Sequence, residues 1–141
     1  MKRATLISLF IVVAIAVAIA LLINRKTSPE SRLKQQFNID ISNREYSIGA
    51  TSEQWLPNGD GHYYVEIILD REENIKNDLI ANLFKPLPIT DDVPRSEFSM
   101  NWEEVDKGYY RFGLLDSDDR NFKIAVYDSN KNKIYFYYQI N

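Results

Sequence analysis

Cysteine is absent from the 141-residue chain, and histidine occurs once, as His62. The lack of cysteine excludes disulfides, thiolate metal sites, a cysteine nucleophile and a lipidated cysteine anchor. A single histidine excludes any site that needs two imidazole groups. The chain also has no glycine-rich phosphate loop, no GxSxG elbow and no HExxH helix. We therefore assign no catalytic residue, no cofactor and no metal site.

Charge is absent from the twenty residues Ala4–Ile23, in which only Thr5 and Ser8 are polar. A helix of this length, at about 1.5 Å per residue, spans roughly 30 Å and matches the hydrocarbon core of a bilayer. Such a helix also satisfies its own backbone hydrogen bonds in lipid. We predict two parts: residues 1–26, a transmembrane signal-anchor segment with basic flanks, and residues 27–141, a soluble domain.

Two interpretations compete with the anchor. A cleaved secretory signal has the same basic start and apolar core, and Ala16, Ala18 and Ala20 could mimic its cleavage site. The apolar run continues beyond these alanines, however, and is longer than a usual signal core. The second alternative is a buried core helix, against which a terminal run of twenty uncharged residues argues.

The flanks of the segment bear on its orientation. Two basic residues lie close to each end, and Arg32 and Lys34 add to the C-terminal side, which favours a cytoplasmic C-terminus. A three-residue tail before the segment and a long domain after it are instead typical of an exported signal-anchor protein. We expect the N-terminus in the cytoplasm and the domain outside. A cysteine-free exported domain suits a bacterial cell envelope.

The part of the chain that follows Lys26 is acidic. It holds all twenty acidic residues and thirteen of the seventeen basic ones, which gives a net charge of −7. Nucleic acids and anionic lipid headgroups bind basic surfaces. We therefore expect neither nucleic acids nor anionic lipid headgroups as partners of this domain. The expected partners are the membrane, through residues 4–23, and an unknown protein or small ligand.

A short helix is predicted over residues 29–37. Ser28 suits the N-cap, Pro29 the first helical position, and Glu30 the first turn. Leu33 and Phe37 are four residues apart and share one face.

A second helix is predicted over residues 71–84. Asp70 and Glu73 have the spacing of a capping box, and apolar residues then recur at helical intervals. Pro86 disfavours helix at Lys85. We expect a loop over residues 85–95.

Alternating apolar residues predict six strands. The residues expected to face inward are Tyr46, Ile48 and Ala50; Tyr63, Val65, Ile67 and Leu69; Phe98, Met100 and Trp102; Tyr110, Phe112 and Leu114; Phe122, Ile124 and Val126; and Ile134, Phe136, Tyr138 and Ile140. The turns between them indicate local antiparallel connections. The order α-β-β-α-β-β-β-β predicts an α+β fold, in which a twisted antiparallel sheet carries a helix on one face.

Tyrosine is concentrated on the opposite face of this predicted sheet, which would hold Tyr64, Tyr109, Tyr127, Tyr135 and Tyr137. Such a face suits contacts with protein or sugar, because tyrosine offers a large rigid surface and a hydroxyl group. Two alternatives stay open. Tyrosine favours strands in any case, and the first helix could cover this face.

The segment Trp55–Gly61 is the most unusual local sequence. Exposed loops that combine tryptophan, proline, glycine and aspartate often recognise a partner. The alternative is a plain hairpin loop whose tryptophan folds back over the sheet edge. The predicted binding residues are, in chain order, Trp55, Asp60, Tyr64, Tyr127, Tyr135 and Tyr137.

Acidic clusters do not complete a known site. Residues 116–119 invite a calcium loop, but Arg120, Asn121 and Tyr127 stand where its fifth, sixth and twelfth residues are required. Glu103 and Glu104 could serve glycoside hydrolysis, yet adjacent strand residues point to opposite faces.

Three functional hypotheses follow. The first is a non-enzymatic, single-pass, membrane-anchored binding module outside the cytoplasm. The second is an immunity-type protein that neutralises a toxin at the membrane, since an acidic domain meets a basic partner faster. The third is an envelope hydrolase that uses Glu103, Glu104 or His62.

Overall fold

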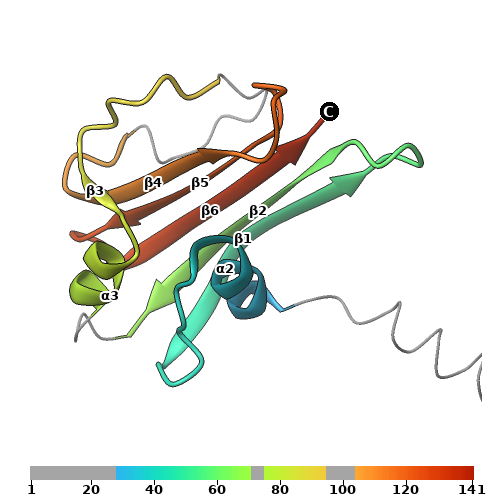
Figure 1. Cartoon of the computed structure of the whole chain (residues 1–141). Coiled ribbons are helices and arrows are strands. Elements are labelled where there is room, and N and C mark those ends of the chain that lie inside the picture. The colour runs from blue at the N-terminus through green and yellow to red at the C-terminus, as the bar shows by residue number, and fades with distance from the viewer. Residues whose placement is uncertain (1–27, 71–74, 95–103) are drawn as a thin grey trace, which may run out of the picture.

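The computed structural model describes residues 28–70, 75–94 and 104–141. These residues form a small α+β domain with a six-stranded antiparallel sheet and two helices (Figure 1). In chain order the elements are α2 (Pro29–Phe37), β1 (Tyr46–Trp55), β2 (Gly61–Leu69), α3 (Ile75–Ala81), β3 (Lys85–Pro86), β4 (Gly108–Leu114), β5 (Phe122–Asp128) and β6 (Lys133–Ile140). Across the sheet the order is β1-β2-β6-β5-β4-β3, so the predicted α+β class and antiparallel sheet are confirmed.

Helix α2 has the predicted bounds, with proline in its first turn and Leu33 and Phe37 buried. It ends at Asn38, whose left-handed backbone (φ 60°) lets its N–H donate to the Lys34 carbonyl. One detail differs from expectation. Ser28 occupies the N-cap position, but its hydroxyl bonds to that of Ser31 and not to a backbone N–H.

Helix α3 ends at Ala81, three residues before the predicted end. Leu83 adopts a left-handed conformation (φ 63°), the N–H of Phe84 donates to the Leu79 carbonyl, and the N–H of Leu83 donates to the Ile80 carbonyl. These two bonds form a Schellman motif, which usually places glycine where Leu83 stands. The first predicted turn of this helix, residues 71–74 with the capping-box Glu73, lies outside the described residues.

Strands β1 and β2 pair as the predicted hairpin, with a register shift between Ile48 and Thr51. The inward role expected for Ile48 is wrong, because this side chain is 40% exposed on the edge strand.

A second correction concerns the loop expected over residues 85–95. Lys85 and Pro86 form strand β3 and pair with Tyr110 and Tyr109. The predicted strand over 98–102 lies outside the described residues.

The two faces of the sheet differ from the prediction in β4 and β5. Phe136 of β6 pairs with Ala125, and Tyr137 pairs with Ile124. Ile124 therefore shares a face with Tyr137, opposite to Phe136, because a one-residue change of register moves every side chain of a strand to the other face. The same register places Tyr110, Phe112, Phe122 and Val126 on the face opposite to Val65 and Ile67.

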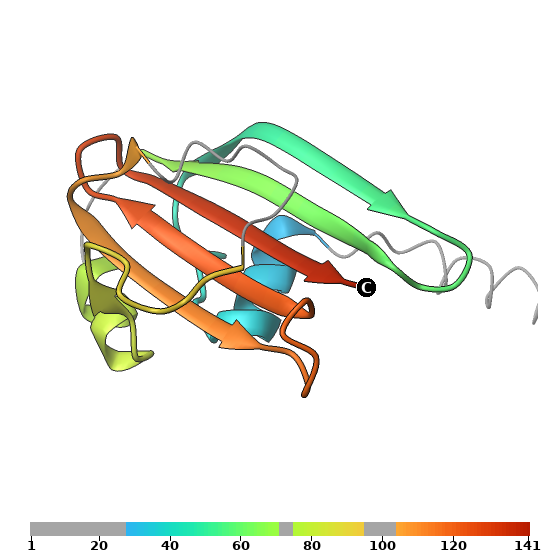
Figure 2. The ribbon, with the colours of Figure 1, turned by 90° about the horizontal axis from the view of Figure 1, so that it is seen from above.

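Both faces carry a buried apolar layer. One layer includes Leu33 and Phe37 of α2 and Ile75 and Leu79 of α3, so both helices pack on the same side of the sheet (Figures 1 and 2). We name this side the helix face. The opposite face is covered in part by the segment after β3, through Leu87, Ile89, Val93 and Val105. We name this side the loop face.

Within the described residues no helix is long and apolar enough to cross a membrane. The predicted anchor in residues 1–26 lies outside the described ranges and remains a prediction.

One side chain of the sheet, Arg111, binds the C-terminal ends of both helices. Arg111 of β4 donates through Nη1 to the carbonyl of Phe37 at 3.2 Å and to the carbonyl of Asn82 at 3.0 Å. Lys123 of β5 donates to the carbonyl of Gln36 at 2.8 Å. The last carbonyls of a helix have no partner within the helix and carry partial negative charge, so these two cations stabilise both helix ends.

We expect Arg111→Met to lower the free energy of unfolding by about 2–4 kcal/mol, because two hydrogen bonds to a charged group are lost. Arg120→Met is the matched control. It removes an exposed guanidinium that pairs with Asp118 and should leave stability almost unchanged. Urea denaturation of the two variants provides the comparison, and equal losses would contradict the assignment.

Candidate binding sites

The structure buries the four predicted tyrosines and divides them between the two faces. Tyr64, Tyr135 and Tyr137 lie on the loop face and are 7%, 1% and 2% exposed. Tyr127 is 3% exposed and lies on the helix face with Tyr109. The expectation of one exposed tyrosine face is therefore corrected, because the register of β5 turns Tyr127 to the other side. The role of these residues in binding remains a prediction.

Three of these buried tyrosines donate hydrogen bonds from their hydroxyl groups within the fold. Tyr64 donates to Glu66 at 2.8 Å, Tyr127 to Asn132 at 2.9 Å and Tyr137 to Gln139 at 2.5 Å. Burial, and then the bond to Glu66, raise the pKa of Tyr64 well above its ordinary value. The Tyr64 phenol therefore stays neutral, and the hydrogen bonds of these three hydroxyl groups stabilise the sheet.

Glu66 is the one carboxylate of β2, and it is 7% exposed. Its second oxygen accepts from Nζ of Lys133 on β6 at 2.8 Å. Burial opposes the charged form, but the bonds from Lys133 and Tyr64 outweigh it and lower the pKa of Glu66. The pair joins neighbouring strands on the loop face and satisfies a charge that would otherwise be costly to bury.

Trp55 lies at the end of β1, where a cluster around Arg32 joins the hairpin to α2. The Arg32 guanidinium lies 4.1 Å from the centre of the Tyr63 ring and donates to the Tyr138 hydroxyl at 3.0 Å and to Glu53 at 2.9 Å. The same Glu53 oxygen accepts from Nε1 of Trp55 at 2.9 Å. The indole also packs on Tyr138, with ring centres 5.6 Å apart.

The ionisation states at this cluster follow from its geometry. Burial lowers the pKa of Arg32, but the bond and charge of Glu53 outweigh it, so the pKa is raised. Burial raises the pKa of Tyr63 to about 12. Arg32 is therefore a cation between neutral phenols and one carboxylate. This arrangement fixes the indole while Trp55 stays 38% and the adjoining Leu56 52% exposed.

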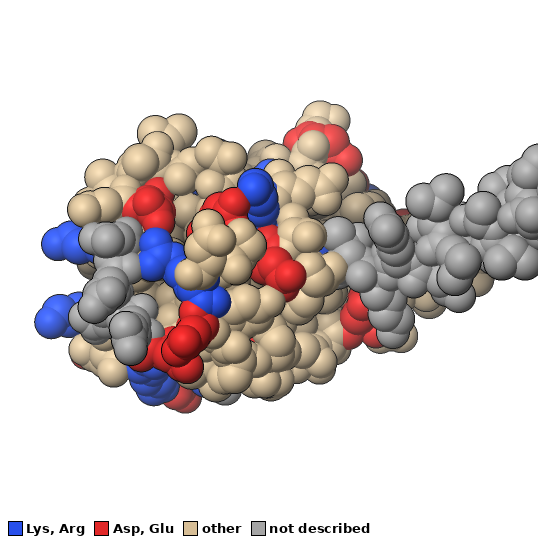
Figure 3. Space-filling view, turned by 90° about the horizontal axis from the view of Figure 1, so that it is seen from below, with Lys and Arg blue, Asp and Glu red and all other residues tan. Residues whose placement is uncertain are grey.

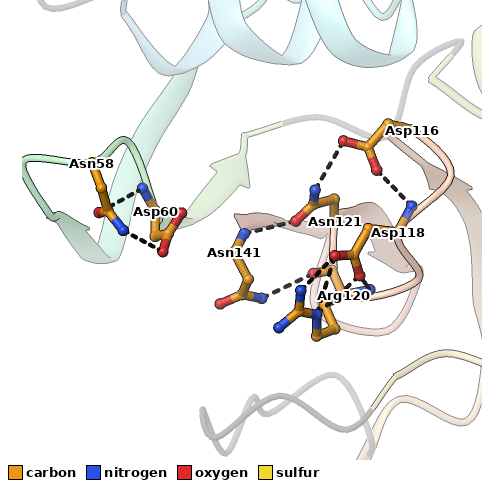
Figure 4. A network of polar contacts seen from close by, with 7 residues as sticks. All are labelled: Asn58, Asp60, Asp116, Asp118, Arg120, Asn121 and Asn141. Carbon is orange, nitrogen blue, oxygen red and sulfur yellow. Dashed lines mark hydrogen bonds and ion pairs between the residues drawn. The ribbon is translucent and has the colours of Figure 1, made fainter.

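Asp60 closes the tip of the hairpin (Figure 4). Its carboxylate accepts from the Asn58 amide at 2.6 Å, and its carbonyl accepts from the Leu56 N–H at 2.7 Å.

The turn between β4 and β5 is held by acidic residues in the same way. Asp116 accepts from Asn121, and Asp118 accepts from Arg120, which lowers the pKa of Asp118 to about 2. These carboxylates stabilise turns.

A serine and the sole histidine meet on the loop face. Ser52 Oγ lies 3.1 Å from Nε2 of His62. A serine hydrolase also needs an acid that orients the histidine and donors for an oxyanion. Glu103 lies outside the described residues, and Glu104 is exposed. Among the described residues, no group of three or more histidine or acidic side chains could hold a metal ion.

A cavity of about 330 Å³ lies at the opposite ends of the strands from Trp55, where α3, β3, β4 and the turn after β5 meet. Its walls include Lys76, Lys107, Tyr109, Tyr127, Ser129 and Pro86. Of these residues only Tyr127 belongs to the predicted binding set. The others come from four separate segments and carry no common motif, so only the tertiary fold could identify them.

No known protein-family model matches the chain. Comparisons with curated proteins and with solved structures likewise gave no match. Any function proposed for the chain therefore depends on its own residues.

Burial lowers the pKa of His62 below its ordinary value. The folded state then binds fewer protons than the unfolded state, whose histidine titrates near pH 6.5. This contribution to stability should be complete above about pH 6.5 and be lost as the pH falls through the folded pKa. Because His62 is the sole histidine, NMR titration of its ring gives this pKa directly. A native value of about 6.5 or higher would contradict the expectation.

Proposed function

We propose that the chain is a single-pass, membrane-anchored binding module whose domain lies outside the cytoplasm, in a bacterial cell envelope. The apolar run over 4–23 supports the anchor, and α2 begins at Pro29, only a few residues after it. The domain would then stand close to the bilayer surface. Its exposed turns would face partners of the envelope.

The observation that carries the binding role is the hairpin tip, which we define as residues 55–60. Trp55 and Leu56 expose apolar surface there, while Arg32 and Glu53 hold the indole in one place. A rigid aromatic residue on a fixed scaffold loses little conformational entropy on binding, which is why tryptophan is frequent at the centres of interfaces. The expected occupant is an apolar pocket on an envelope protein.

The second candidate is an immunity-type protein that binds a toxin at the membrane. The net charge of −7 after Lys26 supports it, because opposite charge speeds association with a basic partner. On the face seen in Figure 3, acidic and basic side chains lie side by side. Attraction of a basic toxin to this face would thus come from the net charge of the domain. A toxin gene beside the gene for this chain would favour this candidate over the first.

The anchor and its orientation are tested with Asn130→Cys, which places the sole cysteine on an exposed turn. We expect a membrane-impermeant maleimide to label this position in intact cells, with the protein retained in the membrane fraction after carbonate washing. Labelling of a released form would instead indicate a cleaved signal. Labelling only after lysis would contradict the proposed orientation.

The binding role is tested by replacing Leu56 with a photo-crosslinking phenylalanine analogue in the full chain. We expect one discrete adduct, which Trp55→Ala abolishes. The matched control carries the analogue at Leu114, a residue of similar exposure (49% against 52%) at the end of strand β4. The same adducts from both positions, or an adduct that Trp55→Ala leaves unchanged, would reject the hairpin tip as the binding surface.

A further inference from the structure

The cavity at the α3 end of the sheet is lined by basic residues, whereas the domain has a net negative charge. Lys76 and Lys107 belong to its walls, and no acidic residue of the described ranges does. Elsewhere Lys34, Lys85 and Lys133 form ion pairs with acidic residues. Within the described part of the chain, neither Lys76 nor Lys107 has an acidic partner. Two lysines thus line one cavity in a domain that has an excess of acids.

The aromatic walls complement these two cations. Nζ of Lys76 lies 5.9 Å from the centre of the Tyr109 ring, at the limit of a cation–π contact. Tyr109 pairs across the sheet with Tyr127, so tyrosines of two neighbouring strands line the cavity. Pro86 adds an apolar ring from β3. Flat apolar surfaces beside a charge suit a ligand that carries an anionic group on a ring.

The backbone around the cavity is held in place before any ligand binds. The amide and the hydroxyl of Ser129 donate to the carbonyl of Lys107 at 3.0 and 3.1 Å. A Cβ atom on Gly108 would lie 1.8 Å from the carbonyl oxygen of Tyr127, so only glycine allows this close approach of β4 to β5. The backbone of the site therefore loses little conformational entropy on binding.

We propose that this cavity binds a small phosphorylated molecule of about monosaccharide size. The phosphoryl dianion would lie between Lys76 and Lys107, and the ring would pack on Tyr109 and Pro86. The volume of about 330 Å³ is at the lower end of the range for ligand sites, which suits a compact ligand. Such a site goes beyond the proposed function, because it needs neither the anchor nor a partner at the hairpin tip.

The test uses the full chain, labelled with ¹⁵N, in a non-ionic detergent that contains no phosphate. The probe is glucose 6-phosphate. We expect saturable shifts of the amide signals of Gly108, Tyr109 and Ser129, and weaker binding at higher salt. The double variant Lys76→Gln/Lys107→Gln should weaken binding by at least about tenfold, since it removes both charges and keeps the side-chain stems.

Lys34→Gln is the matched control. It removes one exposed lysine that pairs with Asp40, away from the cavity, and should leave the affinity unchanged. Thermal melting of each variant confirms that the fold is retained. Equal weakening by the control variant would overturn the proposal, and so would equal binding of uncharged glucose or the absence of saturable shifts in the wild-type protein.

Two sources of the phosphoryl group are distinguished by a second probe, glycerol 3-phosphate, which reproduces part of a lipid headgroup. Tighter binding of glucose 6-phosphate supports the proposal with a soluble sugar phosphate as the ligand class. Tighter binding of glycerol 3-phosphate at the same amide signals supports the phosphoryl site with a lipid headgroup as its source.

Discussion

Arg111 is the side chain on which the arrangement of helices and sheet depends. It extends from β4 on the helix face and donates to the carbonyl that ends α2 and to a carbonyl just after α3. Helices of nine and seven residues are too short to be stable alone, so their stability comes from packing and from satisfied ends. Lys123 adds a third bond, and both burial and the nearby Arg111 charge lower its pKa. One strand pair thus holds both helices over the sheet.

The central strands β2 and β6 are buried on both faces, and this constrains the polar groups. Tyrosine contributes apolar area to either layer, but each hydroxyl must find an acceptor. Glu66 accepts from Tyr64 and from Lys133, which lets one carboxylate remain ionised in the loop-face layer. The concentration of tyrosine is therefore accounted for by packing on two faces, in keeping with the preference of tyrosine for strands.

Local signals could be predicted from the sequence, and non-local pairing could not. The start of α2 depends on neighbouring residues, and its predicted bounds are confirmed. The end of α3 depends on Leu83 in a conformation that leucine seldom adopts, so the residue types gave no signal of where this helix ends. The face of Tyr127 depends on the register between β5 and β6, which alternation within one strand does not contain. Likewise, Lys76 and Lys107 line one cavity only because α3 and the start of β4 lie at the same end of the sheet.

Charge pairing gives the two candidate sites different characters. At the hairpin end Arg32 is matched by Glu53, so the cluster is neutral and what it exposes is apolar surface. In an acidic domain a lysine has many possible carboxylate partners, and pairs such as Lys85 with Asp91 use them. Lys76 and Lys107 line a cavity to which the described residues contribute no carboxylate, so a bound anion would offset the repulsion between two positive charges. The hairpin tip is therefore suited to an apolar protein surface, and the cavity to a small anion.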